Sequence, residues 1–251
     1  MVDCAIMLQA RMGSTRLSGK VLKPVLGKPL LAYAVERLQQ VSQASELWVL
    51  TSQLANDDPI EQWCLENQLQ CYRGSENDVL DRYYQAMQHS QADWILRVTG
   101  DCPLIDPDII NQMLALLEKT QQEQPNGRPD YLSNTLDRTF PRGLDTELIH
   151  KNALETAWKE AKLPAEREHV TPFIYRHPER FKLKQYRQEN DFSSMRWTVD
   201  TPEDFKLIEA IITELAPVQP DFRQKDILAL LEKHPDWLLW NAHIEQVKVS
   251  S

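Results

Sequence analysis

A stretch near the N-terminus gathers positive charge without any acidic side chain, although the chain as a whole carries a formal net charge of -9. Its basic residues are Arg11, Arg16, Lys20, Lys23 and Lys28. A local field of this sign attracts phosphate groups. The stretch also holds two glycines, which permit unusual backbone turns, and hydroxyl groups that donate hydrogen bonds. These residues are Gly13, Gly19, Ser14 and Thr15. We therefore predict a phosphate-binding loop; a merely solvated basic loop is the alternative.

Two familiar phosphate-binding motifs do not fit this loop. A Walker loop has four residues between its glycines and a hydroxyl residue after its lysine. Here five residues separate Gly13 from Gly19, and Val21 follows Lys20. The dinucleotide-binding pattern GxGxxG is absent as well. The sequence therefore gives no support to a P-loop enzyme or a nicotinamide enzyme.

Two aspartates follow apolar segments at places where a parallel sheet presents its ligand site. Asp101 comes after the apolar run 94–99 and Gly100, and Asp200 ends the apolar run 195–199 just before a predicted helix. Ligands bind at the carboxyl ends of strands in open α/β sheets. Mg²⁺ takes one or two carboxylates together with phosphates and water. We predict that Asp101 and Asp200 bind Mg²⁺; for Asp200, helix capping alone is the alternative.

The elements that must position these residues alternate between strand and helix in the first half of the chain. Apolar periodicity predicts strands at 4–10, 46–51, near 71 and at 94–99, and helices at 30–41, 59–67, 78–89 and from about 107. A polar loop is expected at 121–129. The fold class is thus α/β, with a mostly parallel sheet between layers of helices.

The second half is less regular and predicts an α+β portion over residues 130–195. The expected strands lie near Tyr131 and Leu144 and at 181–186 and 195–199, and the expected helices lie at 152–162, 168–176, 202–215 and 224–240. We expect residues 1–251 to form a single domain that ends in a C-terminal helix over 223–240. Trp237 and Trp240 in this helix have two interpretations, packing on the core or forming a homodimer face.

Composition narrows the classes of function. No apolar run approaches the ~20 residues of a membrane-spanning helix, and the N-terminus lacks the basic region of a secretory signal. We predict a cytoplasmic protein without a membrane partner. The net charge of -9 argues against a nucleic-acid partner, because such binding depends on many Lys and Arg contacts to phosphates.

Several blocks of sequence resemble the cytidylyltransferases that activate acidic sugars, including the CMP-ketodeoxyoctonate and CMP-sialate synthetases. The similarity is closest to the cytidylyltransferase-like proteins of spore-coat and surface polysaccharide synthesis. The loop over residues 8–20 resembles the nucleotide-binding loop of this family, and further blocks match at 73–82, 99–105 and 197–204. The chain departs from the ketodeoxyoctonate synthetases at Cys102, where that group usually has an acid, and at Ser18, where proline is common.

The resemblance implies a three-layer fold of the nucleotide-diphospho-sugar transferase type and a nucleotidyltransferase that uses CTP, Mg²⁺ and an acidic sugar. Arg11 and Lys20 are the implied catalytic residues, which contact the triphosphate, and Asp101 and Asp200 are the implied magnesium ligands. The implied nucleotide-binding residues are Ala10, Arg11, Gly13, Ser14, Thr15, Arg16, Lys20, Arg73, Gly74, Ser75, Thr99 and Gly100.

Two charged blocks in the second half, residues 141–147 and 167–172, also resemble this family. We assign them to a sugar pocket with the residues Arg142, Asp145, Glu147, Arg167 and His169. The alternative interpretation is a set of structural ion pairs and helix caps. Two other functions stay open at this stage, a glycosyltransferase that uses a preformed nucleotide sugar and a non-catalytic protein that binds a sugar nucleotide. The segment Asp101-Cys102-Pro103 lacks the DxD pair that such glycosyltransferases generally display.

Overall fold

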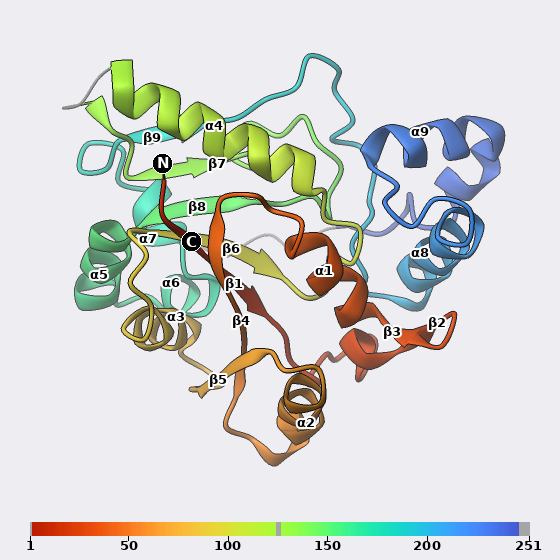
Figure 1. Cartoon of the computed structure of the whole chain (residues 1–251), viewed down its shortest axis with the longest axis horizontal. Coiled ribbons are helices and arrows are strands. Elements are labelled where there is room, and N and C mark those ends of the chain that lie inside the picture. The colour runs from red at the N-terminus through yellow and green to blue at the C-terminus, as the bar shows by residue number, and fades with distance from the viewer. Residues whose placement is uncertain (1, 124–126, 246–251) are drawn as a thin grey trace.

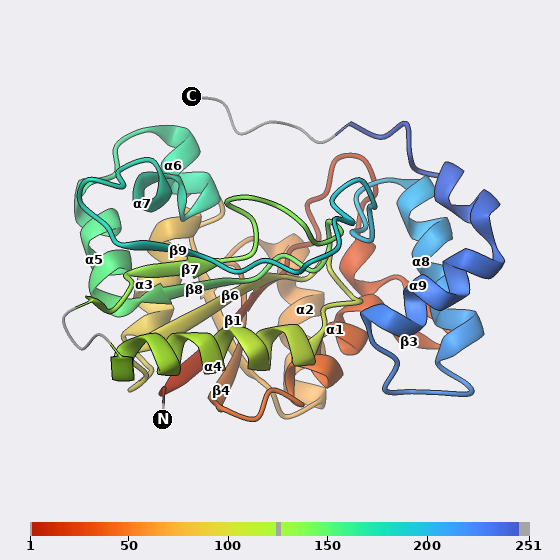
Figure 2. The same ribbon diagram turned by 90° about the horizontal axis from the view of Figure 1, so that it is seen from above.

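The computed structural model of the chain describes residues 2–123 and 127–245 and consists of a central sheet covered by helices on both faces (Figures 1 and 2). The strands of the sheet lie in the order β5-β4-β1-β6-β8-β7-β9. Their bounds are β1 (Cys4–Gln9), β4 (Ala44–Ser52), β5 (Gln70–Gly74), β6 (Trp94–Thr99), β7 (Tyr131–Ser133), β8 (Glu147–His150) and β9 (Leu183–Gln185). Two short strands, β2 (Pro24–Val25) and β3 (Lys28–Pro29), form a separate hairpin.

The sheet is parallel on one side of β6 and mixed on the other. Strands β5, β4, β1 and β6 pair in parallel, as the alternation of strands and helices predicts. Strand β8 then runs antiparallel to both β6 and β7, and β9 pairs in parallel with β7. The predicted α/β class and the irregular second half both follow from this arrangement.

The helices cover the two faces of the sheet in two groups (Figure 2). One face holds α1 and α4, with α8 and α9 at its edge, and the other face holds α3, α5, α6 and α7. Their bounds are α1 (Leu30–Leu38), α2 (Asp58–Glu66), α3 (Val79–Met87), α4 (Pro107–Glu123), α5 (Lys151–Glu160), α6 (Pro164–His169), α7 (Pro172–Tyr175), α8 (Pro202–Leu215) and α9 (Gln224–Lys233). Among the described residues, short 3-10 helices also occur, with the bounds η1 (Lys20–Leu22), η2 (Ala55–Asp57) and η4 (Pro235–Leu239).

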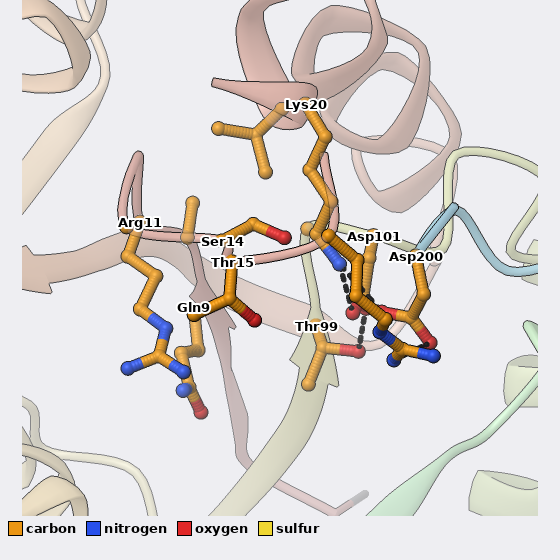
Figure 3. Close-up of a pocket in the computed structure, with 13 residues that line it drawn as sticks. Gln9, Arg11, Ser14, Thr15, Lys20, Thr99, Asp101 and Asp200 are labelled. Atoms are coloured by element: carbon orange, nitrogen blue, oxygen red, sulfur yellow. Dashed lines mark hydrogen bonds and ion pairs between the residues drawn. The ribbon is translucent and has the colours of Figure 1, made fainter. Parts of the chain in front are cut away.

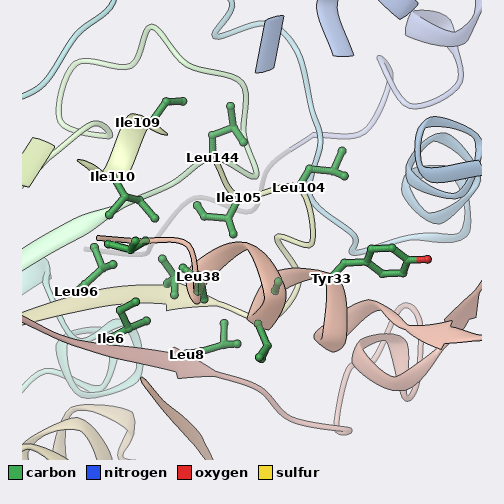
Figure 4. Close-up of a cluster of buried hydrophobic side chains, with 14 of the residues drawn as sticks. Ile6, Leu8, Tyr33, Leu38, Leu96, Leu104, Ile105, Ile109, Ile110 and Leu144 are labelled. Atoms are coloured by element: carbon green, nitrogen blue, oxygen red, sulfur yellow. The ribbon is translucent and has the colours of Figure 1, made fainter. Parts of the chain in front are cut away.

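The core is built from the alternation of apolar side chains along the strands. In β1, Ile6 and Leu8 point to the face that carries α1 and α4, whereas Ala5 and Met7 point to the opposite face. All four are almost fully buried. Figure 4 shows the first face, where Ile6 and Leu8 lie with side chains from α1 and α4. The central strand of the parallel half is therefore buried on both sides and holds the loop that follows it in place.

Five sequence predictions need correction. Residues 195–199 do not form a strand; only an isolated bridge joins Arg196 to Arg142. The strand expected near Leu144 begins at Glu147, after a turn at Gly143. The helix expected at 168–176 is split into α6 and α7, because Val170 takes a positive φ of 72° and Pro172 cannot continue the helix.

The predicted C-terminal helix 223–240 is also interrupted. Helix α9 ends at Lys233, and η4 begins at Pro235, because the residue before a proline is driven out of the helical region. Trp237 and Trp240 stack at 5.2 Å between ring centroids and pack against the core. In addition, α4 continues through Glu123 into the predicted loop, whose residues 124–126 lie outside the described residues. Among the described helices, none combines the length and apolar character needed to cross a membrane.

Candidate active site

The loop that follows β1 is held over the end of the sheet by a buried carboxylate. Asp57, which is 1% exposed, accepts a hydrogen bond of 2.7 Å from the amide of Met12 and another of 3.2 Å from the amide of Ser52. The carbonyl of Met12 in turn accepts from the amides of Ser14 and Gly19. Gly19 has a φ of 64°, in the left-handed region that favours glycine. This turn starts η1 and directs Lys20 back over the sheet.

The ammonium group of Lys20 bridges the two predicted metal ligands (Figure 3). Its Nζ donates to Asp101 Oδ2 at 3.0 Å and to Asp200 Oδ1 at 2.7 Å. Lys20 is only 8% exposed. Burial by itself would lower the pKa of Lys20, but attraction by Asp101 and Asp200 outweighs burial and raises the pKa. Lys20 is therefore charged at neutral pH, and its ammonium group binds both acids.

Residues far apart in the sequence bring the two acids together. Asp101 follows β6 and accepts a hydrogen bond of 2.6 Å from the hydroxyl of Thr99. The amide of Val199 and the hydroxyl of Thr198 both donate to the carbonyl of Asp101, at 2.8 and 3.1 Å. These contacts fasten the segment before Asp200 to the end of β6. The sequence predicted that these acids meet, and the structure places them on either side of a single ammonium group.

A buried network fixes the orientation of Asp200. Its Oδ2 accepts a hydrogen bond of 2.7 Å from Arg196, whose guanidinium also binds Asp204 at 2.8 and 2.9 Å. Asn241 donates to Asp204 at 2.9 Å and to the carbonyl of Arg196 at 3.0 Å. Burial alone would raise the pKa of Asp200, but Lys20 and Arg196 lower it, so this carboxylate is ionised at neutral pH. Arg16 adds a third cation, 3.3 Å from Asp200.

The carboxylates of Asp101 and Asp200 fit a divalent cation of the magnesium type. The two carboxylates converge on one point, now filled by an ammonium group, so their oxygen atoms lie within reach of a single metal ion. Within the described ranges, no group of three His, Cys, Asp or Glu side chains gathers that could hold a metal alone. Mg²⁺ commonly binds through one or two carboxylates and takes its remaining ligands from phosphates and water. Asp101 and Asp200 are the residues that would hold it.

A cavity of about 240 Å³ lies between the loop and these acids. Most of the predicted nucleotide-binding and metal-binding residues line it: Ala10, Arg11, Gly13, Ser14, Thr15, Arg16, Lys20, Thr99, Gly100, Asp101 and Asp200. Gln9 and Val21 also line this space, which we call the small cavity. Arg11 points along Gln9 in Figure 3 and forms an ion pair of 3.1 Å with Glu76. Hydroxyls, amides and cations thus face one space suited to a triphosphate.

A second, larger cavity of about 1120 Å³, the large cavity, adjoins the first. It contains four of the predicted sugar-binding residues, Arg142, Asp145, Glu147 and His169, together with residues that the sequence did not single out, such as Arg97, Arg138 and Tyr175. A third cavity of about 200 Å³, the junction, shares Asp101 and Asp200 with the small cavity, and Arg142 and Asp145 with the large cavity. Burial lowers the pKa of His169, so its imidazole is neutral at neutral pH.

Two predicted arginines do not reach either of these cavities. The guanidinium of Arg73 binds acids on α2, with Asp58 at 2.7 Å and Glu61 at 2.6 Å. The guanidinium of Arg167 binds Asp78 and the carbonyl of Trp158, and so ties α6 to α3 and α5. For Arg167, the structure supports the alternative interpretation, an ion pair that serves the fold. Arg73, which was predicted to bind the nucleotide, likewise forms ion pairs with acids of α2.

The two residues after Arg73 also turn away from the small cavity. Gly74 packs against Arg82, so that a Cβ atom at Gly74 would lie 2.8 Å from the Cγ of Arg82. Ser75 accepts a hydrogen bond from the amide of Asp78, just before α3. These two residues thus shape the turn that carries Glu76 toward Arg11.

Some residues that complete the site carried little signal in the sequence. Arg196 and Asp204 flank Asp200 at a spacing of four residues, which is a weak indication of a shared network. Arg138 lies in the block next to the predicted sugar pocket. Asn241 gave no signal, because its partners lie 37 and 45 residues away in the chain.

Comparison with known proteins agrees with the geometry of this site. The sequence model of the family described as cytidylyltransferase matches residues 5–233. The uncharacterized protein MJ1063 of Methanocaldococcus jannaschii is 35% identical over 242 residues, which cover 95% of this chain and 94% of that protein. The spore coat polysaccharide biosynthesis protein SpsF of Bacillus subtilis is 32% identical over 243 residues, with 94% and 97% of the two chains covered.

Solved structures give the same result. A cytidylyltransferase from Leptospira borgpetersenii matches 99% of this chain and 100% of its own at 34% identity and a TM-score of 0.88. A CMP:2-keto-3-deoxy-manno-octonic acid synthetase in complex with CTP is 18% identical, covers 84% and 99% of the two chains with a TM-score of 0.65, and supports the fold alone. The predicted fold, family resemblance and nucleotidyltransferase class are confirmed. The chain belongs to the cytidylyltransferase family.

Proposed function

We propose that this enzyme transfers the cytidylyl group of CTP to an acidic sugar, with release of pyrophosphate, in the biosynthesis of a surface polysaccharide. One observation carries the proposal: the ammonium group of Lys20 lies between Asp101 and Asp200, at the junction of the small cavity and the large cavity. The small cavity suits a triphosphate, and the large cavity has the volume and the polar lining that a sugar requires. The similarity to the spore coat polysaccharide biosynthesis protein SpsF supports the polysaccharide role.

In the proposed reaction, a hydroxyl oxygen of the sugar attacks the α-phosphorus of CTP, and the bond from this phosphorus to the oxygen that bridges the α- and β-phosphates breaks. The proton of the hydroxyl passes to water, and the electron pair of the broken bond leaves with pyrophosphate. Negative charge then develops on the phosphoryl oxygens and on the departing pyrophosphate. Arg11, Arg16 and Lys20 line the small cavity and would stabilise this charge. The chain has little covalent chemistry to perform, so positioning and electrostatics supply most of the acceleration.

We propose Mg²⁺ as the cofactor, bound by Asp101 and Asp200. When bound, it supplies positive charge that neutralises the phosphate oxygens. The network of Arg196 and Asp204 keeps the Asp200 carboxylate turned toward the small cavity. With the acids so engaged, Lys20 would donate to the phosphates. The cytoplasmic location and the homodimer stay predictions.

A pyrophosphate-release screen tests this function. The purified chain is mixed with Mg²⁺, one of the common ribonucleoside triphosphates and one sugar from a panel. The panel contains 3-deoxy-manno-octulosonate, its 8-amino-8-deoxy analogue, N-acetylneuraminate, glucuronate and mannose. We expect release only with CTP and only with acidic sugars, and no release from the Asp200→Asn variant. Release with neutral mannose alone, or with no sugar of the panel, would contradict the proposal.

A further inference from the structure

Two cysteines face each other where α2 packs against β5 (Figure 1). Cys64 is fully buried and lies one turn after Ile60 on the inner face of α2. Cys71 packs against the same core cluster as Cys64, whereas its neighbour Tyr72 packs against the cluster on the opposite face of the sheet. The thiol of Cys64 donates a hydrogen bond to the sulfur of Cys71. The two side chains therefore point toward each other between helix and strand.

The turn between α2 and β5 holds this arrangement in place. Residues 65–70 lie between Cys64 and Cys71, and the amide of Leu69 donates to the carbonyl of Cys64 at 2.9 Å. Gln68 takes a φ of 56°, a left-handed conformation of the kind that commonly ends a helix. The strand that carries Cys71 is thus turned back directly beneath the helix that carries Cys64.

The two thiols differ in exposure and in acidity. Cys71 is half-buried and within reach of a small solute, whereas Cys64 is closed off from solvent. The hydrogen bond from Cys64 lowers the pKa of the Cys71 thiol, and the nearby guanidinium of Arg73 adds to this effect, although burial opposes it. The same hydrogen bond, together with burial, raises the pKa of Cys64. Cys71 is therefore the nucleophile of the pair, because the thiolate is the reactive form of cysteine.

The remaining two cysteines lie elsewhere in the fold and supply internal controls. All four cysteines of the chain belong to the residues that the structure describes. Cys4 lies in β1 and Cys102 lies in the segment after β6, and both are buried. Burial raises the pKa of both thiols, so neither is reactive at neutral pH.

We infer that Cys64 and Cys71 form a reversible oxidation site, which a small-molecule disulfide such as oxidised glutathione converts into a disulfide bond between α2 and β5. The sulfur of Cys71 attacks one sulfur of the oxidant, whose disulfide bond breaks, and the first glutathione leaves as a thiolate. The sulfur of Cys64 then attacks the Cys71 sulfur of the mixed disulfide, and the second glutathione leaves. The two cysteines lose two electrons and two protons, and the oxidant gains them as two thiols.

Peptide mass spectrometry of the full chain tests the inference. The folded wild type is treated with excess oxidised glutathione, and the remaining thiols are alkylated after unfolding. We expect a disulfide between Cys64 and Cys71 that dithiothreitol reduces again, with Cys4 and Cys102 alkylated.

Two variants separate the steps of the reaction. Cys64→Ala lacks the second thiol, so one glutathione should stay attached to Cys71. Cys71→Ser lacks the attacking thiol, so Cys64 should stay reduced in spite of the oxidant. The melting temperature of each untreated variant shows whether it folds.

The melting temperature also supplies a second readout of the bond. A disulfide restricts the unfolded chain, so the oxidised wild type should melt about 5 °C above the reduced wild type. Treatment with the oxidant should leave the melting temperature of Cys71→Ser unchanged.

Several results would overturn the inference. They are a treated wild type that keeps all its thiols, a glutathione that stays on wild-type Cys71, and a disulfide that includes Cys4 or Cys102. A lower melting temperature of the oxidised wild type would also overturn it, because the native fold would then hold the two thiols out of bonding position. These readouts need neither CTP nor a sugar. They therefore leave the proposed function untouched, and a failed pyrophosphate-release screen leaves the oxidation site untouched.

Discussion

The small and large cavities differ in how the chain balances their charges. In the small cavity, Lys20 is compensated by Asp101 and Asp200, which lie 81 and 180 residues away in the sequence. In the large cavity, Arg138 is compensated by Asp145, only seven residues away. The first arrangement depends on the whole parallel half of the sheet and on the C-terminal segment. The second arrangement depends mainly on one block of the irregular half.

This difference suggests a division of labour between the cavities. Charges that meet through distant segments keep their geometry only while the fold is intact, which suits a reaction that needs one arrangement of cation, acids and phosphates. Charges paired within one short segment can change together when the sequence of that segment changes. This suits a pocket that selects among sugars. Four predictions test this contrast, from the largest expected effect to the smallest.

The strongest test removes the shared cation of the small cavity. We expect Lys20→Met to lower turnover by about 100- to 1000-fold, since Lys20 stabilises charge that develops during transfer. The variant also leaves Asp101 and Asp200 facing each other without their ammonium partner. Added Mg²⁺ should therefore raise the melting temperature of the variant more than that of the wild type.

Lys28→Met is the matched control for this change. Lys28 belongs to the same basic stretch but forms an exposed ion pair with Glu36. Its loss should leave turnover and the magnesium effect nearly unchanged. A Lys20→Met enzyme with wild-type turnover would refute the role of the small cavity.

The close contact between Gly143 and the backbone of Trp197 supplies the second test. Gly143→Ala places a methyl group about 2.5 Å from the backbone of Trp197 at a φ of 104°. We expect a loss of about 3 kcal/mol in the free energy of unfolding, because strain in the backbone adds to the steric clash. Gly27→Ala is the control, since it also has a positive φ but has no neighbour within 4 Å of the added atom. Equal losses in the free energy of unfolding at both glycines, measured in urea, would show that the close contact at Gly143 does not constrain this residue.

Acid pH should weaken the irregular half through His150. Burial lowers the pKa of this histidine to about 4, and its Nδ1 accepts a hydrogen bond from the amide of Asn152. The unfolded chain binds the proton near pH 6.5, so stability is highest above that pH and falls as the pH drops toward 4. Between pH 7 and pH 5 we expect a loss of about 2 kcal/mol from this group.

The comparison of His150→Gln with the exposed His243→Gln isolates this contribution. Urea unfolding at several pH values should show a shallower pH dependence for His150→Gln than for the wild type. His243→Gln should follow the wild type. The same slope in all three proteins would show that His150 does not titrate in this way.

The smallest effect is expected at the edge of the buried network. Asn241→Ala removes the hydrogen bonds that hold Arg196 and Asp204, and so loosens Asp200. We expect about a tenfold rise in the Mg²⁺ concentration needed for half-maximal activity, as is typical when a residue that orients a metal ligand is lost. Electron paramagnetic resonance with Mn²⁺ measures the same affinity without turnover.

Asn67→Ala is the control for this test, because Asn67 is exposed at the end of α2 and its side chain donates to the carbonyl of Trp63, away from Asp200. It should leave the affinity for Mn²⁺ unchanged. If Asn241→Ala lowers the melting temperature but not the affinity, the network supports the fold and does not position Asp200.

The sequence predicted the parallel half better than the irregular half, for physical reasons. Buried strands such as β1 and β6 show continuous apolar runs, and α8 begins where Thr201 caps it, with Asp204 completing the capping box. These signals are local. Residues 195–199 look like a strand for the same reason, but their hydrogen bonds go to the loop at Arg142 and to Asp101. No local pattern reveals such partners.

The site shows the same limit. The basic loop and the two strand-end aspartates were recognisable because charge and glycine stood out against an acidic, glycine-poor chain. Arg73 and Arg167 were predicted from the family resemblance, yet Arg73 binds an acid on α2 and Arg167 binds Asp78, the residue before α3. Tertiary contacts decide which arginine forms an ion pair. Arg138 binds Asp145, whereas among the described residues no acid lies within ion-pair distance of Arg142.

A crystal structure of the chain with Mg²⁺ and the non-hydrolysable analogue α,β-methylene-CTP tests the central claim most directly. We predict a metal ion bound by Asp101 and Asp200, with the Lys20 ammonium moved from the acids onto the phosphates. A nucleotide bound elsewhere, with Lys20 still bridging the two acids, would contradict it.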